Sequence, residues 1–298
     1  MRSQNHFEKI TIYPFSNINA ETFTNFTQVA NSNNKMKRQN QFSFLSLLSV
    51  AYFFMLLTEF TPVNSQAAPD FEYNEASGKG PSKWASLNPA WTLCGTGKMQ
   101  SPVAISGATL LPSLGRLNTN YKPVPATASH TTHGIKIVIQ GDGGGLLLDG
   151  TFYKLIQFHW HWGSEHTING ARQALELHLV HQNNGRTAAI GILFKIGHHD
   201  KTLTDLLPKM EGLTVGDKDI GIVNPASIRL HNDYYRYMGS FTTPPCTEGV
   251  TWTVFRELNE VSQDQVDELK RLAPDTFGST ARPSQALNGR DLNSFHSV

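Results

Sequence analysis

Two short segments of the chain carry histidines at a spacing that suits a metal ion. They are QFHWHW, residues 157–162, and LELHLVH, residues 175–181. Side chains alternate between the two faces of a β-strand, so His159 and His161 share one face of the first segment. If the segments pair as antiparallel strands, His178 faces the same point. Imidazole is a common neutral ligand of zinc, and three protein ligands with one open position are typical of catalytic zinc.

A hydrogen-bonding side chain precedes two of these histidines by two positions. Gln157 stands before His159, and Glu176 stands before His178, each on the face of its histidine. A ligand histidine usually donates its second ring N–H to a carboxylate or carbonyl oxygen, which holds the ring in one orientation. A solvent-exposed polar face, the alternative interpretation, more often carries Lys, Thr or Ser. We therefore predict a Zn²⁺ centre whose ligands are oriented by Gln157 and Glu176.

Two nearby histidines do not belong to this set. His181 falls on the apolar face of its segment, and we expect it to be a core histidine. His166 follows Glu165 in the turn between the two segments, where we expect it to support only the loop.

The rest of the chain predicts a frame of strands for these segments. Gly134–Gln140 alternates apolar and polar residues, and Leu146–Leu148 lies between glycines. Thr187–Ile196 is continuously apolar, which indicates a central strand buried on both faces. Frequent glycine and proline, with 24 and 15 residues, and scarce helical periodicity favour a β-rich domain with many turns.

Two segments predict helices. Asp200–Leu207 is expected to form a short helix. Further along, Ser262 and Gln265 have the spacing of a capping box, in which each side chain bonds the other residue's backbone N–H. This pattern predicts a helix from about Gln263 to Arg271.

Charge and organisation narrow the function classes. The formal net charge is +1, and no basic run persists through residues 68–298, which argues against nucleic acid as a partner. No internal repeat or linker divides residues 68–298, so we predict one domain there.

The segment before this domain has the order of a secretory signal. Basic residues around Met36 precede an apolar run from Phe42 to Leu57, and small residues end at Ala67. We expect residues 36–67 to be a signal peptide cleaved after Ala67, with residues 1–35 an unstructured extension if Met36, rather than Met1, is the true start. The alternative is a membrane anchor, but the run is short for a span and is interrupted by serines. No stable membrane span is expected after cleavage.

The chain has two cysteines, Cys94 and Cys246, and both follow the expected cleavage site. In a secreted protein an even pair indicates a disulfide. The loop that it would close is long, which corresponds to about 5 kcal/mol of stabilisation in the chain-entropy model. Two buried free thiols are the alternative.

Several motifs together give the chain a family resemblance. The run QFHWHWGSEHTINGARQALELHLVH closely resembles the zinc site of the alpha-class carbonic anhydrases. The resemblance covers about residues 70–290, and the run CGTGKMQSP around Cys94 is most similar to plant-type members. Its other motifs are Gly239–Cys246 (GSFTTPPC), Val250–Trp252 (VTW), Gln100–Pro102 (QSP) and Ala281–Pro283 (ARP).

The resemblance implies a fold, a reaction and a small-molecule substrate. The fold would be a β-rich α+β domain around a large, mostly antiparallel, twisted central sheet with short peripheral helices. The reaction would be the reversible hydration of carbon dioxide to bicarbonate and a proton by zinc-bound hydroxide. Carbonic anhydrase is itself the standard case of a zinc ion that lowers the pKa of bound water to about 7. Oligomeric state stays open.

The same resemblance implies the roles of individual residues. His159, His161 and His178 would be the zinc ligands. The hydroxyl of Thr242 would take a hydrogen bond from the hydroxide and donate one to Glu165. The proton shuttle would be His133, with His130 as a nearby competitor, and the paired cysteines of secreted members match Cys94 and Cys246. The carbon dioxide pocket would be lined by Val180, Ala189, Phe241, Thr243, Val250 and Trp252.

Four features depart from the family pattern. Phe71 replaces an early tryptophan, the segment Gly141–Gly145 is short and glycine-rich, and Thr280 stands where many members have asparagine. Phe241 replaces a leucine in the pocket wall and is expected to narrow the pocket and lower turnover. None of these changes removes a catalytic group.

Two other functions compete with catalysis. A member of the same fold that serves as a storage or binding protein usually lacks one or more zinc histidines, and all three are present here. A zinc peptidase is not supported, because no H-E-x-x-H motif occurs. The signal predicts the extracellular space, with a plastid reached through the secretory route as the alternative.

Overall fold

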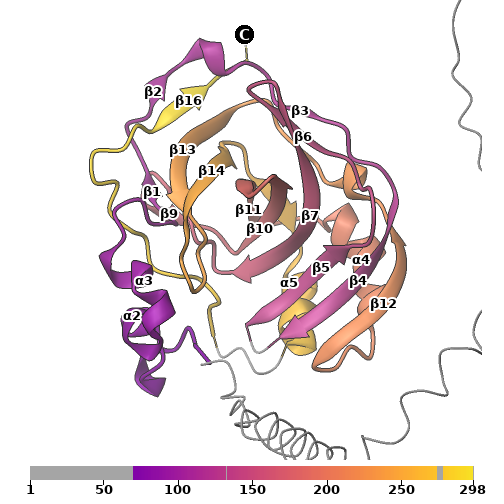
Figure 1. The fold of residues 1–298 in the computed structure, drawn as a ribbon. Helices are drawn as coiled ribbons and strands as arrows, with labels where there is room; N and C mark the ends of the chain where they lie inside the picture. Colours follow the sequence, from indigo (N-terminus) through magenta and orange to yellow (C-terminus); the bar gives the residue numbers. More distant parts are fainter. Residues whose placement is uncertain (1–69, 132, 274–277, 298) are drawn as a thin grey trace, which may run out of the picture. The chain divides into compact units, whose positions relative to one another are not determined.

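A large twisted sheet forms the frame of the protein (Figure 1). The structure is a computed structural model, and it describes residues 70–131, 133–273 and 278–297. The predicted extension and signal peptide, with the cleavage site after Ala67, lie outside the described residues. Within the described residues, no helix has the length and apolar character that crossing a membrane requires.

The described residues contribute thirteen strands to the main sheet, and most neighbours are antiparallel. The predicted β-rich α+β class is thereby confirmed. Parallel pairs join β11 to β14, β11 to β15 and β16 to β2. The main path runs through β12 (Gly216–Val223), β4 (Val124–Thr131), β5 (Gly134–Ile139), β7 (Thr151–Trp162), β10 (Leu175–Asn183), β11 (Arg186–Ile196), β14 (Glu248–Phe255), β13 (Tyr234–Ser240), β16 (Asn293–Phe295) and β2 (Thr109–Leu110).

Smaller elements surround this path. The short strands β3 (Asn118–Thr119), β6 (Gly145–Leu148) and β15 (Asn259–Val261) pair beside it, and β1 (Ala104–Ile105), β8 (Thr167–Ile168) and β9 (Ala171–Arg172) form a separate sheet. The helices are η1 (Glu75–Ser77), α2 (Trp84–Leu87), η2 (Pro89–Trp91), α3 (Leu93–Thr96), η3 (Pro112–Leu114), α4 (Lys201–Met210), η4 (Pro225–Ser227) and α5 (Gln263–Leu272).

Each strand that the sequence predicts is present. β7 and β10 pair antiparallel, and β11 is buried from Thr187 to Phe194, as expected for a central strand. At α5 both hydrogen bonds of the predicted capping box are formed between Ser262 and Gln265. α4 begins as predicted, because the Asp200 side chain accepts a hydrogen bond from Leu203 N–H.

The predicted end of α4 is wrong. The helix runs past Leu207 through Pro208 to Met210, although proline usually marks a helix end. Leu206 and Met210 are both buried, so packing of the last turn outweighs the local preference of proline.

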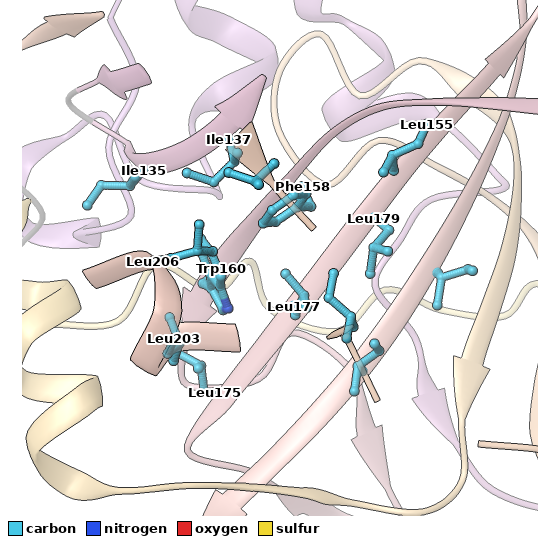
Figure 2. Packing of buried hydrophobic residues seen from close by; sticks show 14 of the residues in the cluster. Ile135, Ile137, Leu155, Phe158, Trp160, Leu175, Leu177, Leu179, Leu203 and Leu206 are labelled. Carbon is cyan, nitrogen blue, oxygen red and sulfur yellow. The ribbon is translucent and has the colours of Figure 1, made fainter. Parts of the chain in front are cut away.

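One face of the sheet is packed with apolar side chains. A single row crosses five strands through directly paired residues. Figure 2 shows Ile137, Phe158 and Leu179 of this row, with Leu203 and Leu206 of α4 in the same cluster. The full row is Ala128, Ile137, Phe158, Leu179 and Ile190. Because side chains alternate, the neighbouring residues of these strands point to the other face, where the histidines lie.

His181 lies in the core, as its place on the apolar face predicts. It is fully buried, its Nε2 is 2.8 Å from the Tyr121 hydroxyl, and its Nδ1 is 3.3 Å from the carbonyl oxygen of Ala188. These partners suit a neutral ring that donates from Nδ1 and accepts at Nε2. Burial accordingly lowers the pKa of His181 from 6.5 to about 4.

This histidine is expected to weaken the fold in mild acid. The unfolded chain takes up the proton near pH 6.5, whereas the folded chain resists it until about pH 4. The unfolded state therefore binds more protons in this window, and the free energy of unfolding decreases as pH falls, by about 3 kcal/mol from this group. Urea unfolding at pH 7, 5.5 and 4 measures it. In His181→Gln the free energy of unfolding should decrease by about 3 kcal/mol less between pH 7 and pH 4. Parallel curves of unfolding free energy against pH for the two proteins would contradict the role given to His181.

Candidate metal centre

The pairing of β7 with β10 brings three histidines to one point. His178 is directly opposite His159, and Glu176 is opposite His161, so all four side chains lie on the face away from the apolar row. Ring nitrogens of the three histidines lie within 4.8 Å of one another. The strand pairing that the alternation predicts is therefore the cause of the cluster.

Each histidine of the cluster has one ring nitrogen engaged in a hydrogen bond. His159 Nδ1 is 2.9 Å from Gln157 Oε1, and His178 Nε2 is 2.8 Å from Glu176 Oε1. His161 Nδ1 is 2.7 Å from the backbone carbonyl oxygen of Thr280. The oxygens accept from these nitrogens, which leaves His159 Nε2, His161 Nε2 and His178 Nδ1 directed at the shared point.

The arrangement fits a zinc ion. His161 Nε2 is buried and has no hydrogen-bond partner among the described residues, which is costly unless the nitrogen binds something else. Burial lowers the pKa of both His159 and His161, which favours the neutral form that coordinates a metal. Three imidazole nitrogens with a free fourth direction are a donor set that zinc prefers.

Glu176 connects His178 to a buried chain of hydrogen bonds. Its Oε1 also accepts from His166 Nδ1 at 2.7 Å, and His166 Nε2 is 2.7 Å from the hydroxyl of Tyr237. Burial raises the pKa of Glu176, but His166 and His178 outweigh it and hold the pKa well below its usual range. For His178 burial lowers the pKa, but Glu176, and then Glu165, outweigh it and raise the pKa. Glu176 thus makes the ring of His178 more basic, which would strengthen it as a metal ligand.

His166 has a larger role than the loop support that we expected. It is fully buried, and its backbone N–H donates to Glu176 Oε2 at 2.8 Å. His166, Glu176 and His178 also lie close enough to share a metal ion, but they are already joined by short hydrogen bonds. Their hydrogen bonds hold the His178 ring of the first cluster in place. The network continues from the Tyr237 hydroxyl to Ser101 Oγ, 2.8 Å away.

Gly191 leaves room for this carboxylate. It stands opposite His178 on the neighbouring strand β11, and a Cβ atom there would lie 2.9 Å from Glu176 Oε1. Any side chain at this position would displace Glu176 from His178, because the contact is shorter than real Cβ atoms show. In the sequence this glycine only interrupts an apolar strand.

A small cavity opens beside the cluster. It has a volume of about 70 Å³ and is formed by residues from β7, β10, β11, β14 and the loop after β13. All six residues expected in the substrate pocket line it, so strand pairing and the loop bring the set together. The lining is Gln157, His159, His178, Val180, Ala189, Phe241, Thr242, Thr243, Val250 and Trp252.

Glu165 is buried next to the cluster. Its Oε1 accepts a hydrogen bond from the backbone N–H of Arg282 at 2.9 Å. Its Oε2 lies 3.5 Å from His161 Nε2 and 3.8 Å from His178 Nδ1, and has no hydrogen-bond partner among the described residues. The hydrogen bond expected from Thr242 is therefore not formed in this structure, where Oε2 faces the two imidazoles.

A larger cavity of about 260 Å³ leads outward and includes His133. The His133 ring stacks on Phe71 with a centroid distance of 3.6 Å and an interplanar angle of 4°. Its Nε2 is 2.8 Å from the carbonyl oxygen of Phe71 and 3.3 Å from Asp70 Oδ1. The side chain is 25% exposed, so His133 lies between the cavity and solvent.

His130, the competitor for the shuttle, lies elsewhere. It is buried on β4, on the face of Ala126 and Ala128, and opposite Ile135. Its two ring nitrogens have no hydrogen-bond partner among the described residues. This face belongs to the apolar core rather than to the cavity.

The predicted disulfide is formed between Cys94 and Cys246, with the Cα atoms 5.1 Å apart. It lies in an apolar cluster with Phe71 and Trp84. Cys246 N–H donates to the carbonyl oxygen of Thr243 at 2.9 Å, so the disulfide anchors the loop that carries three residues of the small cavity.

Comparison with known proteins agrees with this geometry. The family model for eukaryotic-type carbonic anhydrase matches residues 79–296. Alpha carbonic anhydrase 7 of Arabidopsis thaliana is 38% identical in an alignment of length 270 that covers 85% of this chain and 98% of that protein. A hyperthermostable carbonic anhydrase from a hydrothermal vent chimney superposes with a TM-score of 0.70 at 33% identity, covering 76% of this chain and 100% of that one. Dioscorin, solved in complex with ascorbate, superposes with a TM-score of 0.72 at 35% identity, covering 77% of this chain and 99% of dioscorin.

Proposed function

The chain belongs to the eukaryotic-type carbonic anhydrase family, and we propose that His159, His161 and His178 hold the zinc ion with which it hydrates carbon dioxide reversibly to bicarbonate and a proton. The observation that carries this proposal is the set of three ring nitrogens directed at one point while each second nitrogen is hydrogen-bonded. When bound, zinc supplies a hydroxide nucleophile near neutral pH by lowering the pKa of water.

The small cavity holds the carbon dioxide. Its walls are mostly apolar, and about 70 Å³ suits a small neutral molecule better than a hydrated ion. Thr242 has the position and the chemistry to aim the attacking oxygen, because its hydroxyl can accept one hydrogen bond and donate another. Glu165 Oε2 is the buried acceptor available for that second bond. These groups hold the reactants in a reactive orientation, which is the main contribution of the protein.

Stopped-flow hydration with metal analysis tests the function. The protein should contain one zinc per chain and hydrate carbon dioxide, with both lost on chelation and restored by zinc. Stoichiometric zinc without hydration would favour a binding or storage protein of the same fold, a reading with which the similarity to dioscorin is compatible.

We propose His133 as the group that carries the product proton to solvent. Imidazole exchanges protons near neutral pH, and His133 lies at the junction of the cavity and solvent. His133→Ala is expected to slow turnover by about 10-fold or more in dilute buffer, with recovery on addition of imidazole. Stopped-flow rates at several buffer concentrations measure this. His130→Ala is the matched control, and equal buffer dependence in wild type and His133→Ala would remove the role from His133.

We also propose that the protein follows the secretory route. The disulfide supports an oxidising compartment, and the plant relatives are alpha carbonic anhydrases. Extracellular space is the proposed destination, with a plastid as the alternative. Sequencing of the mature amino terminus tests the signal peptide, and a protein that retains residues before Ala67 would contradict it.

A further inference from the structure

Lys136 lies on the wall of the larger cavity, one strand away from the metal centre. The directly paired residues across the sheet are Ser129 on β4, Lys136 on β5, His159 on β7 and His178 on β10. Neighbouring strands are about 4.8 Å apart, so the Lys136 side chain rises from the same face as the ligands, beside His159. It lines the cavity together with His133, His159 and His161.

The ammonium group of Lys136 has no counter-ion in this cavity. In the described part of the chain it forms no ion pair and no hydrogen bond, and no acidic residue lines the cavity. Asp70, which does not line the cavity, is 3.3 Å from His133 Nε2 and 3.8 Å from Lys79 Nζ, so its charge is shared with those groups. Lys136 therefore gives the approach to the centre a positive potential.

We propose that Lys136 forms an anion-binding subsite that holds bicarbonate, and other small monovalent anions, at the entrance to the reaction site. This inference rests on the proposed function. An ammonium offers three donors to a carboxylate-type anion, and Lys136 is exposed at the cavity wall, where an anion from solvent can reach it. Carbon dioxide is neutral and does not respond to this charge. Lys136 thus distinguishes the two carbon substrates of the same reaction.

The effect should be seen in anion affinity rather than in carbon dioxide binding. In Lys136→Gln the dissociation constant of thiocyanate, and the inhibition constant of bicarbonate, are expected to rise about 3- to 5-fold at low ionic strength, the upper part of the range for an exposed charge pair. The increase should shrink in 0.5 M salt, because screening then acts within a few ångströms. The KM for carbon dioxide should stay unchanged. Titration calorimetry of the zinc-loaded full chain measures thiocyanate binding, and stopped-flow kinetics measures the other constants.

Two further variants separate charge from packing. Lys136→Arg keeps the charge and should bind thiocyanate as the wild type does. Lys154→Gln removes an exposed lysine on β7 that does not line the cavity, and it should also match the wild type. Wild-type anion affinity in Lys136→Gln, or equal loss in the Gln and Arg variants, would overturn the subsite. A wild-type protein without hydration activity would instead overturn the proposed function, while thiocyanate binding would still test Lys136.

Discussion

Replacement of His178 by alanine is expected to abolish stoichiometric zinc binding and carbon dioxide hydration. The change removes one of three nitrogens directed at the shared point and, among the described residues, leaves Glu176 with His166 as its only histidine partner. A catalytic zinc site needs three protein ligands, so the two remaining histidines hold the metal weakly. The loss of affinity should exceed the roughly 10- to 100-fold cost of removing only an orienting partner. Metal content after dialysis and competition with a chelating dye measure it.

The chain offers a matched control on the same strand. His181→Gln also removes a histidine of β10, but this one faces the core and is not part of the cluster. At pH 7 it should retain one zinc per chain, even though the fold is less stable. Glu176→Gln should be intermediate, with zinc bound roughly 10- to 100-fold more weakly. A His178→Ala protein with full zinc and full turnover would remove His178 from the ligand set.

The parts of the site that the sequence predicts are those with a local signal. Alternation along a strand is a period of two residues, so His159, His161 and the residues two positions before each ligand can be placed from a short segment. Nδ1 of His161 shows the limit of prediction from a local sequence pattern. Its partner is the backbone carbonyl of Thr280, more than a hundred positions away, and a backbone group leaves no mark in the side-chain pattern. The role of Gly191 depends in the same way on which residue faces it.

Pairing between segments that are distant in the sequence explains which contacts of the sheet the sequence does not predict. The parallel contact of β11 with β14 joins Thr187 to Val250, and neither segment contains information about the other. No strand was predicted for β13, whose sequence YYRYMGS lacks alternation. Its Arg236 is buried because the guanidinium donates to Thr253 Oγ1 at 3.0 Å, a partner that only the folded sheet supplies. Alternating or continuously apolar patterns predict five strands, but β14, which alternates as VTWTV, is also among the strands without a prediction.

Replacement of Thr242 by valine is expected to lower turnover by about 10²-fold, the cost of misplacing a reacting group by about 1 Å. Valine keeps the branched shape in a cavity of about 70 Å³ but removes the hydroxyl, so packing is preserved while the group proposed to bond the attacking oxygen and Glu165 during the reaction is lost. Because Thr242 is not among the clustered histidines, zinc content should remain at one per chain.

Thr242→Ser is the comparison that isolates the hydroxyl. Serine keeps the donor and acceptor and loses one methyl group, so its turnover should stay within a few-fold of wild type. The turnover of Glu165→Gln should fall as much as that of the valine variant, because an amide nitrogen at the Oε2 position cannot accept a hydrogen bond from the Thr242 hydroxyl. Stopped-flow turnover per bound zinc is the measurement. Equal activity of the serine and valine variants would show that Thr242 shapes the cavity without orienting the reaction, and Glu165 would then serve mainly to anchor Arg282 beside the centre.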